Sequence, residues 1–285
     1  MAELIIHPET QSHIDAYLGA PAHALLLVGP GGSGKLSLAK KTAEAALQLK
    51  PGSFDSYGYS YVMRSDEGKA ISVEAAHQLE HFLSLKVPSK TVVNRVVIVE
   101  DSQLLTVEAQ NALLKTIEEP PEGTILILTA HHNRSLLPTI HSRLQTIDVR
   151  RPTRLDLEKY FIQKGFDDAQ VRQVFAMSGG LPGLMQALLD DENHPLRIAA
   201  RQVRELLGQS VFQRLAGIDA LSRQKELAVD MIDILQQMAH ISLQTADGAA
   251  AAHWRKILRA SYDAAEAIRS SAQLKLVLTD MVLKF

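Results

Sequence analysis

Apolar and polar positions occur in blocks through the first half of the chain. Five short segments are rich in aliphatic and β-branched residues, as in the run Ala24–Val28. Strands without strict polar alternation are typical of a parallel sheet that is covered on both faces. The predicted strands span residues 24–28, 60–63, 95–99, 124–129 and 145–149.

Helical spacing separates these strands. Val73, Ala76 and Leu79, for example, recur at the spacing of one helical face. Strands that alternate with helices predict an α/β domain with a parallel sheet over residues 1–150. The predicted helices of this domain span residues 9–18, 36–47, 72–85 and 106–117.

Beyond residue 150 the strand signals stop and the chain becomes helical. An acidic break at 190–195, which ends in proline, is the best candidate for a linker. It divides the remainder into helical units at 151–191 and 192–285. We expect a small alanine-rich turn at 249–252. The predicted helices span residues 155–164, 169–177, 183–189, 196–207, 212–218, 227–242, 254–270 and 274–284.

Composition narrows the class of protein. Of 285 residues, 46% are hydrophobic and 22% are charged, as in soluble globular proteins. The formal charge of -2 argues against a polycation that coats nucleic acid, so any DNA contact is local or shared with partners. The absence of cysteine excludes disulfides and fits a reducing compartment. Without a signal-peptide pattern or membrane-length apolar run, we expect a cytoplasmic protein.

A glycine-rich loop joins the first strand to the next helix. Backbone N–H groups of such a loop surround a phosphate, and the helix N-terminus adds a positive field. Lys35 supplies a cation for the outer phosphates. The order of strand, loop and helix predicts a P-loop nucleotide cradle, with ATP as its candidate ligand. The predicted loop residues are Gly29, Pro30, Gly31, Gly32, Ser33, Gly34, Lys35, Leu36 and Ser37.

One position departs from the P-loop pattern, which ends in Ser or Thr after the lysine. Leu36 occupies that position and cannot ligate magnesium. Ser37 comes one residue later, which is a rotation of about 100° on a helix. Whether the loop binds nucleotide, and whether magnesium accompanies it, therefore stays open.

Two carboxylates follow the strand at 95–99. In P-loop ATPases an acidic residue at the end of the strand beside the loop holds magnesium and helps to polarise water. Glu100 and Asp101 reverse the usual order of Asp then Glu. A degenerate metal site and a pair of solvent-facing carboxylates are both open interpretations.

Two further segments are specific enough to indicate a family. Residues 110–121 read QNALLKTIEEPP, and residues 137–143 read LPTIHSR. With the P-loop and the SGGLPG segment at 178–183, the chain resembles AAA+ clamp-loader subunits of bacterial DNA polymerase III. The resemblance implies an AAA+ domain at 1–150, a helical lid at 151–191 and an all-α collar for oligomerisation at 192–285.

Within this family the chain resembles delta-prime-type subunits more than gamma/tau motors. Leu36 replaces the magnesium ligand, and Gly183 stands where motors carry a lid arginine that senses the γ-phosphate. The family's four-cysteine zinc module cannot exist here. The segment at 49–59, where the family carries it, is too short and contains no cysteine. We therefore expect no zinc.

Arg143 matches the family arginine that reaches the ATP site of a neighbouring subunit, although Leu144 replaces the family's cysteine. An arginine finger in trans is worth about three to five decades of rate. The resemblance thus implies a weakly hydrolysing or non-hydrolysing subunit that helps to load the sliding clamp onto primed DNA. Its implied partners are gamma/tau and delta subunits, with the clamp and primer–template DNA reached through the complex.

Two other functions stay open. In the first, the chain is itself a gamma-like motor. Glu100, Asp101 and Lys35 then carry out metal-assisted hydrolysis of ATP, and Ser37 or water replaces the lost metal ligand. In the second, it is an AAA+ scaffold in DNA repair or recombination.

Some polar positions carry less weight. Thr129, or Ala130 and His131 beside it, stands where the family keeps a polar sensor, but Ala130 and His131 depart from the usual residues. His131 and His132 do not form a metal pair, because adjacent strand residues diverge and no third ligand is at hand. We therefore assign no residue as a metal ligand.

Overall fold

The computed structural model describes residues 4–65, 69–88, 92–132, 136–191, 193–244, 246–269 and 272–285. The chain forms two compact units, Met1–Pro152 and Thr153–Phe285. The expected collar and all of the expected lid except residues 151 and 152 belong to the second unit, and the boundary between lid and collar stays a prediction. Glu192 of the predicted linker and Ser270, the predicted end of a helix, lie outside the described residues.

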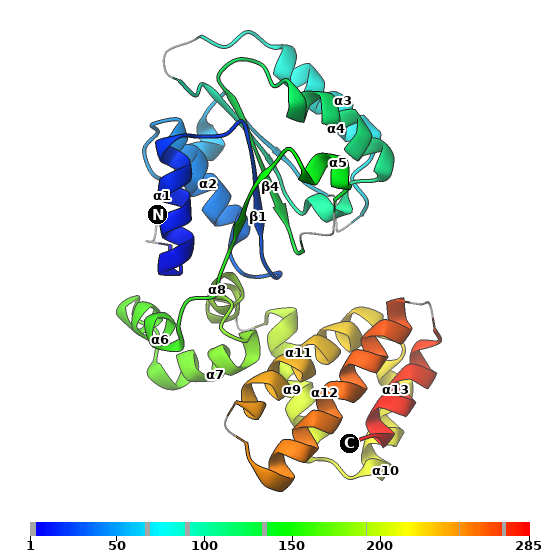
Figure 1. Ribbon diagram of the computed structural model, residues 1–285. Helices are drawn as coiled ribbons and strands as arrows, with labels where there is room; N and C mark the ends of the chain where they lie inside the picture. Colours follow the sequence, from blue (N-terminus) through cyan, green and yellow to red (C-terminus); the bar gives the residue numbers. More distant parts are fainter. Residues whose placement is uncertain are drawn as a thin grey trace. The chain divides into compact units, whose positions relative to one another are not determined.

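A five-stranded sheet forms the centre of the first unit (Figure 1). Every neighbouring pair of strands is parallel, which confirms the predicted α/β class. In sheet order the strands are β2 (Ser60–Met63), β3 (Arg95–Val99), β4 (Thr124–Ala130), β1 (Ala24–Val28) and β5 (Gln145–Asp148).

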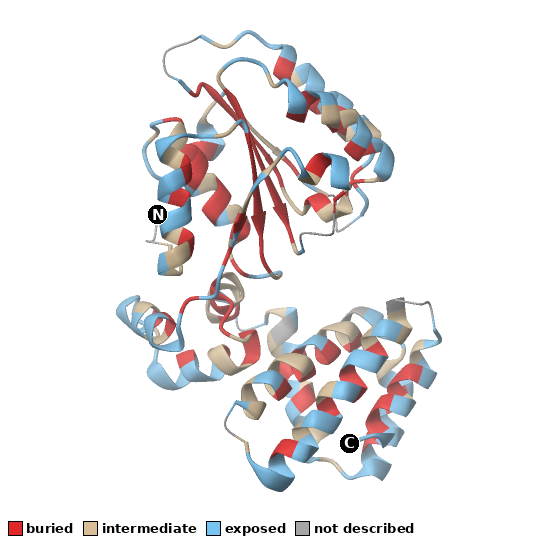
Figure 2. Cartoon of the chain, in the orientation of Figure 1, coloured by how far each residue is buried: buried red, intermediate tan, exposed pale blue. Residues whose placement is uncertain are grey.

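Helices cover both faces of this sheet. Leu25 and Leu27 of β1 pack with two of the helices, whereas Leu26 packs with the other three on the opposite face. The central strands are buried throughout (Figure 2). The first face carries α1 (Pro8–Gly19) and α2 (Lys35–Ala46), and the second carries α3 (Val73–Ser84), α4 (Val107–Glu118) and α5 (Pro138–His141).

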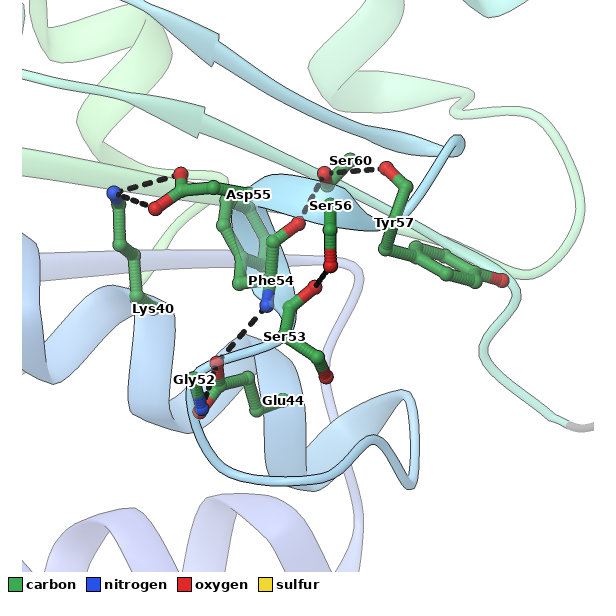
Figure 3. A network of polar contacts seen from close by, with 9 residues as sticks. All are labelled: Lys40, Glu44, Gly52, Ser53, Phe54, Asp55, Ser56, Tyr57 and Ser60. Atoms are coloured by element: carbon green, nitrogen blue, oxygen red, sulfur yellow. Dashed lines mark hydrogen bonds and ion pairs between the residues drawn. The ribbon is translucent and has the colours of Figure 1, made fainter. Parts of the chain in front are cut away.

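The connection from α2 to β2 is short and is organised by a carboxylate (Figure 3). Glu44 is 4% exposed, and its Oε1 accepts hydrogen bonds from the backbone N–H groups of Gly52 (2.8 Å) and Phe54 (3.0 Å). These bonds hold Phe54 in the core at the start of the 3-10 helix η1 (Phe54–Ser56). Lys40 and Asp55 form an ion pair of 2.7 Å at the surface of the same connection.

The second unit is helical. α11 packs against α9 and α12, and α13 packs against α10 and α12. Arg214 is buried, and its guanidinium donates to the carbonyl groups of Leu206, Leu207 and Phe285. The helices are α6 (Arg154–Gln163), α7 (Asp168–Ser178), α8 (Pro182–Asp190), α9 (Pro195–Gly208), α10 (Val211–Leu221), α11 (Lys225–Leu243), α12 (Gly248–Arg269) and α13 (Leu274–Leu283).

One prediction about this unit is wrong. The segment 249–252 is the first turn of α12, not a separate turn. Alanine has the highest helix propensity of all residues, so four alanines after Gly248 extend the helix towards its N-terminus. Among the described residues, no helix is both long and apolar enough to cross a membrane.

Replacing Glu44 with Ala should lower the free energy of unfolding by about 2–3 kcal/mol, because two backbone donors lose a charged acceptor. Urea denaturation measures this change. Asp55→Asn is the matched control, since it breaks only the exposed pair with Lys40 and should cost no more than about 1 kcal/mol. Equal losses in the two variants would contradict the role of Glu44.

Candidate functional site

The predicted phosphate loop lies between β1 and α2. Gly32 and Gly34 adopt positive φ angles of 73° and 83°, a region that favours glycine, and Gly34 caps α2. Gly29 is also restricted, because a Cβ there would lie 3.1 Å from the carbonyl oxygen of Val149. The backbone therefore has the curvature that a phosphate cradle needs.

Lys35 is folded back over this loop. Its side chain is buried, and its Nζ donates to the carbonyl oxygens of Gly29 (2.8 Å) and Pro30 (2.9 Å). Burial lowers the pKa of Lys35, whereas the negative charges of Asp101 and Glu100 act against that shift. Lys35 thus lies beside the loop, and the two carboxylates favour its protonated form.

One hydroxyl group of the loop has no hydrogen-bond partner among the described residues. This group is the Oγ of Ser33, which is buried. Buried polar groups without partners are rare in native proteins, so this hydroxyl suits a ligand atom. Together with the glycines and Lys35, it fits a bound phosphate.

The position directly after Lys35, where the P-loop pattern has Ser or Thr, carries no side-chain oxygen. Leu36 is half-buried and packs against the core on the α1 and α2 face of the sheet. Ser37 is exposed on the first turn of α2. Position 36 therefore stabilises the domain in place of the oxygen that a motor P-loop offers.

Glu100 and Asp101 follow β3 at the same end of the sheet. The prediction that they end the strand beside the loop is wrong, because β4 lies between β1 and β3. Thr129 of β4 accepts a hydrogen bond from the Asp101 backbone N–H at 3.0 Å. Its own carbonyl accepts one from Ser102 at 2.9 Å, so Thr129 holds the turn that carries the acids.

Asp101 is engaged by His131, a pair that the sequence analysis did not find. The Nε2 of His131 lies 3.3 Å from Oδ1 of Asp101, and His131 also borders the loop at Gly31. A signal was present, because both residues follow strands of a parallel sheet. In the part of the chain that the structure describes, no three metal-ligating side chains gather in one place.

The two carboxylates differ in their electrostatics. A hydrogen bond from His131 is the largest cause that holds the pKa of Asp101 below its ordinary value. Burial, followed by the charge of Asp101, raises the pKa of Glu100. The positive charges of Arg64, Lys40 and Lys35 act against that rise. Asp101 is thus the more strongly ionised member of the pair.

Arg143 lies at the other end of the sheet. It precedes β5, whose residue Gln145 pairs with Leu25 near the start of β1, whereas the phosphate loop follows the end of β1. Arg143 is exposed and follows α5, a helix of four residues that the sequence analysis missed. Pro138 at the first position of α5 was an available signal. The structure therefore separates Arg143 from the loop of its own chain.

Replacing His131 with Ala should raise the pKa of Asp101, because the variant lacks the hydrogen bond that lowers it. A carboxyl-carbon NMR titration measures the shift, and Gln103→Ala, which removes a lesser cause, should give a smaller rise. Since the folded pKa is depressed, the pair stabilises the protein above about pH 4, and this is lost as the pH falls through the folded pKa. Above about pH 4 the variant should therefore be less stable than the wild type, and it should lose less stability as the pH falls below that value. An unchanged pKa would contradict the pairing.

The family model described as DNA polymerase III, delta subunit, matches residues 11–153. The chain is 31% identical over 184 residues to DNA polymerase III subunit delta' of Pseudomonas aeruginosa, covering 59% of this chain and 56% of that protein. It is also 31% identical over 213 residues to DNA polymerase III subunit gamma/tau of Mycobacterium tuberculosis. That match covers 63% of this chain and 35% of that protein. The chain thus spans just over half the length of the delta' relative.

A solved structure of Thermotoga maritima, a DNA polymerase III gamma subunit-related protein, superimposes with a TM-score of 0.54 at 16% identity. The match covers 96% of this chain and 97% of that one, and it supports the fold. The family model, which matches half of the chain, confirms the resemblance seen in the sequence motifs. The protein belongs to the DNA polymerase III delta subunit family.

Proposed function

We propose that this chain is a delta-prime-type subunit of a bacterial clamp loader, which acts in the cytoplasm to help load the sliding clamp onto primed DNA. Its partners are gamma/tau-type and delta-type subunits, and the clamp and primer–template DNA are reached through the complex. The family match and the relatives named DNA polymerase III subunit delta' support this proposal.

The position of Arg143 is the observation that carries the proposal. The residue is exposed at the end of the sheet opposite to the chain's own phosphate loop. Because Arg143 and the phosphate loop lie at opposite ends of the sheet, the arginine is better placed to contact a site on another chain than the site of its own chain. Its planar and permanently charged guanidinium suits the charge that develops on a transferred phosphoryl group.

The chain's own cradle, in this proposal, binds nucleotide without appreciable turnover. The glycine geometry, Lys35 and the unpaired hydroxyl of Ser33 support phosphate binding. The packing of Leu36 and the engagement of Asp101 by His131 argue against a magnesium centre that activates water. In phosphoryl transfer, the magnesium ion bound to ATP neutralises the charge that develops on the phosphates. This loop offers the magnesium ion one ligand fewer than the P-loop pattern does.

A gamma-like motor is the second candidate function. The burial of Lys35 near the charges of Glu100 and Asp101 favours it, as does the similarity to gamma/tau subunits. In this alternative the purified or assembled chain hydrolyses ATP, and Lys35→Ala abolishes that turnover.

Replacing Arg143 with Ala should slow single-turnover hydrolysis at the neighbouring ATP site by about three decades, the lower value for a finger in trans. The measurement uses the reconstituted loader with clamp and primed DNA, and clamp loading should fall with hydrolysis. Arg150→Ala is the matched control, because Arg150 is an exposed arginine of the same unit that pairs with Glu9. Unchanged hydrolysis and loading would overturn the finger.

The purified chain should bind ATP with the same affinity with and without magnesium, because position 36 offers the metal no oxygen. Titration calorimetry measures both affinities. Lys35→Ala should weaken binding by about 10- to 100-fold, as expected for a lost charge-assisted contact. Lys41→Ala, which removes an exposed lysine of the same helix, should not. Tighter binding with magnesium, together with turnover, would favour the motor.

A further inference from the structure

The guanidinium of Arg143 is held by three acceptors of its own chain. Its Nε lies 2.6 Å from Oε1 of Glu118. Its Nη1 donates to the carbonyl oxygen of Thr139 at 2.7 Å and to Oγ of Ser142 at 3.2 Å. Nη2 makes no hydrogen bond with a described residue. Two nitrogens therefore fix the plane of the group, and the third keeps both of its N–H donors.

Helix α4 supports the segment that carries this arginine at two places. Near its start, the buried side chain of Gln110 accepts a hydrogen bond from the backbone N–H of Leu137 at 2.8 Å. At its end, Glu118 binds Arg143. Between these contacts Ile140 of α5 is fully buried in the core on that face of the sheet. One helix thus sets both the path of the segment and the direction of its arginine.

We infer that Glu118 is a positioning residue for Arg143, so that the Nη2 edge is presented to an anion of a neighbouring chain. This inference rests on the proposed function, in which that anion is the phosphate of a bound ATP. An exposed arginine samples many rotamers, and only a few place it against a partner's phosphate. Groups that are held in the productive geometry before the encounter accelerate phosphoryl transfer, because they need no reorganisation.

An ordinary surface ion pair is the competing explanation, since the two side chains are 40% and 45% exposed. Such pairs contribute little to stability. The two explanations differ in what they predict. A surface pair affects folding slightly and catalysis not at all, whereas a positioning residue affects catalysis only while Arg143 is present.

The test compares five loaders that carry the variants Arg143→Ala, Glu118→Ala, Glu118→Gln, the double variant Glu118→Ala/Arg143→Ala, and Glu119→Ala. Glu119 is the matched control, because it is an exposed glutamate beside Glu118 without an ion pair among the described residues. The readouts are kcat and KM for ATP in the presence of clamp and primed DNA, and the thermal midpoint of each purified chain.

Glu118→Ala should lower kcat at the neighbouring site about two- to fivefold, the change expected from the loss of one exposed ion pair that orients the group. KM for ATP should stay constant, because the nucleotide cradle belongs to the neighbour. Glu118→Gln keeps an oxygen acceptor and should recover part of the loss. The double variant should match Arg143→Ala, since Glu118 acts through the arginine. Glu119→Ala should have the kcat of the wild type. The thermal midpoints of Glu118→Ala and Glu119→Ala should agree.

The outcomes separate the two levels of the proposal. If Arg143→Ala is defective while Glu118→Ala equals Glu119→Ala, the positioning role is overturned and the proposed function stands. If the double variant loses more than Arg143→Ala alone, Glu118 acts by another route and the positioning role is again overturned. If Arg143→Ala behaves as the wild type, both proposals fail.

Discussion

Parallel hydrogen bonding between the five strands is the constraint on which both functional regions depend. Because all strands run the same way, their carboxyl ends gather the phosphate loop, Glu100 and Asp101 at one end of the sheet. The same constraint puts Arg143, which precedes a strand, at the amino end. A single chain therefore carries a cradle and an arginine that is separated from it, which is the arrangement that the proposed role of Arg143 in trans requires.

The charged groups at the cradle already have partners within the chain. Lys35 donates to two loop carbonyl groups, and Asp101 pairs with His131. A bound phosphate has to compete with the carbonyl oxygens for the lysine, and a metal ion has to compete with the histidine for the carboxylate. Both competitions lower the affinity of this loop for magnesium-bound ATP. The replacement of a metal ligand by Leu36 acts in the same direction.

The two motifs that identified the family are in direct contact in the folded chain. Gln110 and Glu118 belong to the first motif, and each bonds a residue of the second, Leu137 and Arg143 respectively. Residues far apart in sequence thus form one structural unit, which consists of α4 and the segment that ends at the arginine. The unit has a physical purpose, because an arginine on a short exposed turn needs a support outside that turn.

Much of the fold could be predicted from the sequence, since strands, long helices and glycine turns follow from local patterns. The apolar run Ala24–Val28 and the loop up to Lys35 lie where those patterns place them. Helix α5 was missed because four residues carry no periodicity. Which strands are neighbours depends on long-range pairing, so only the tertiary structure put β4 between the loop and the acids. It also decided that Asp101 meets His131 and that Arg143 meets Glu118, because such contacts depend on sheet order and helix packing. The sequence by itself determined the chemical groups, and the tertiary structure decided their partners.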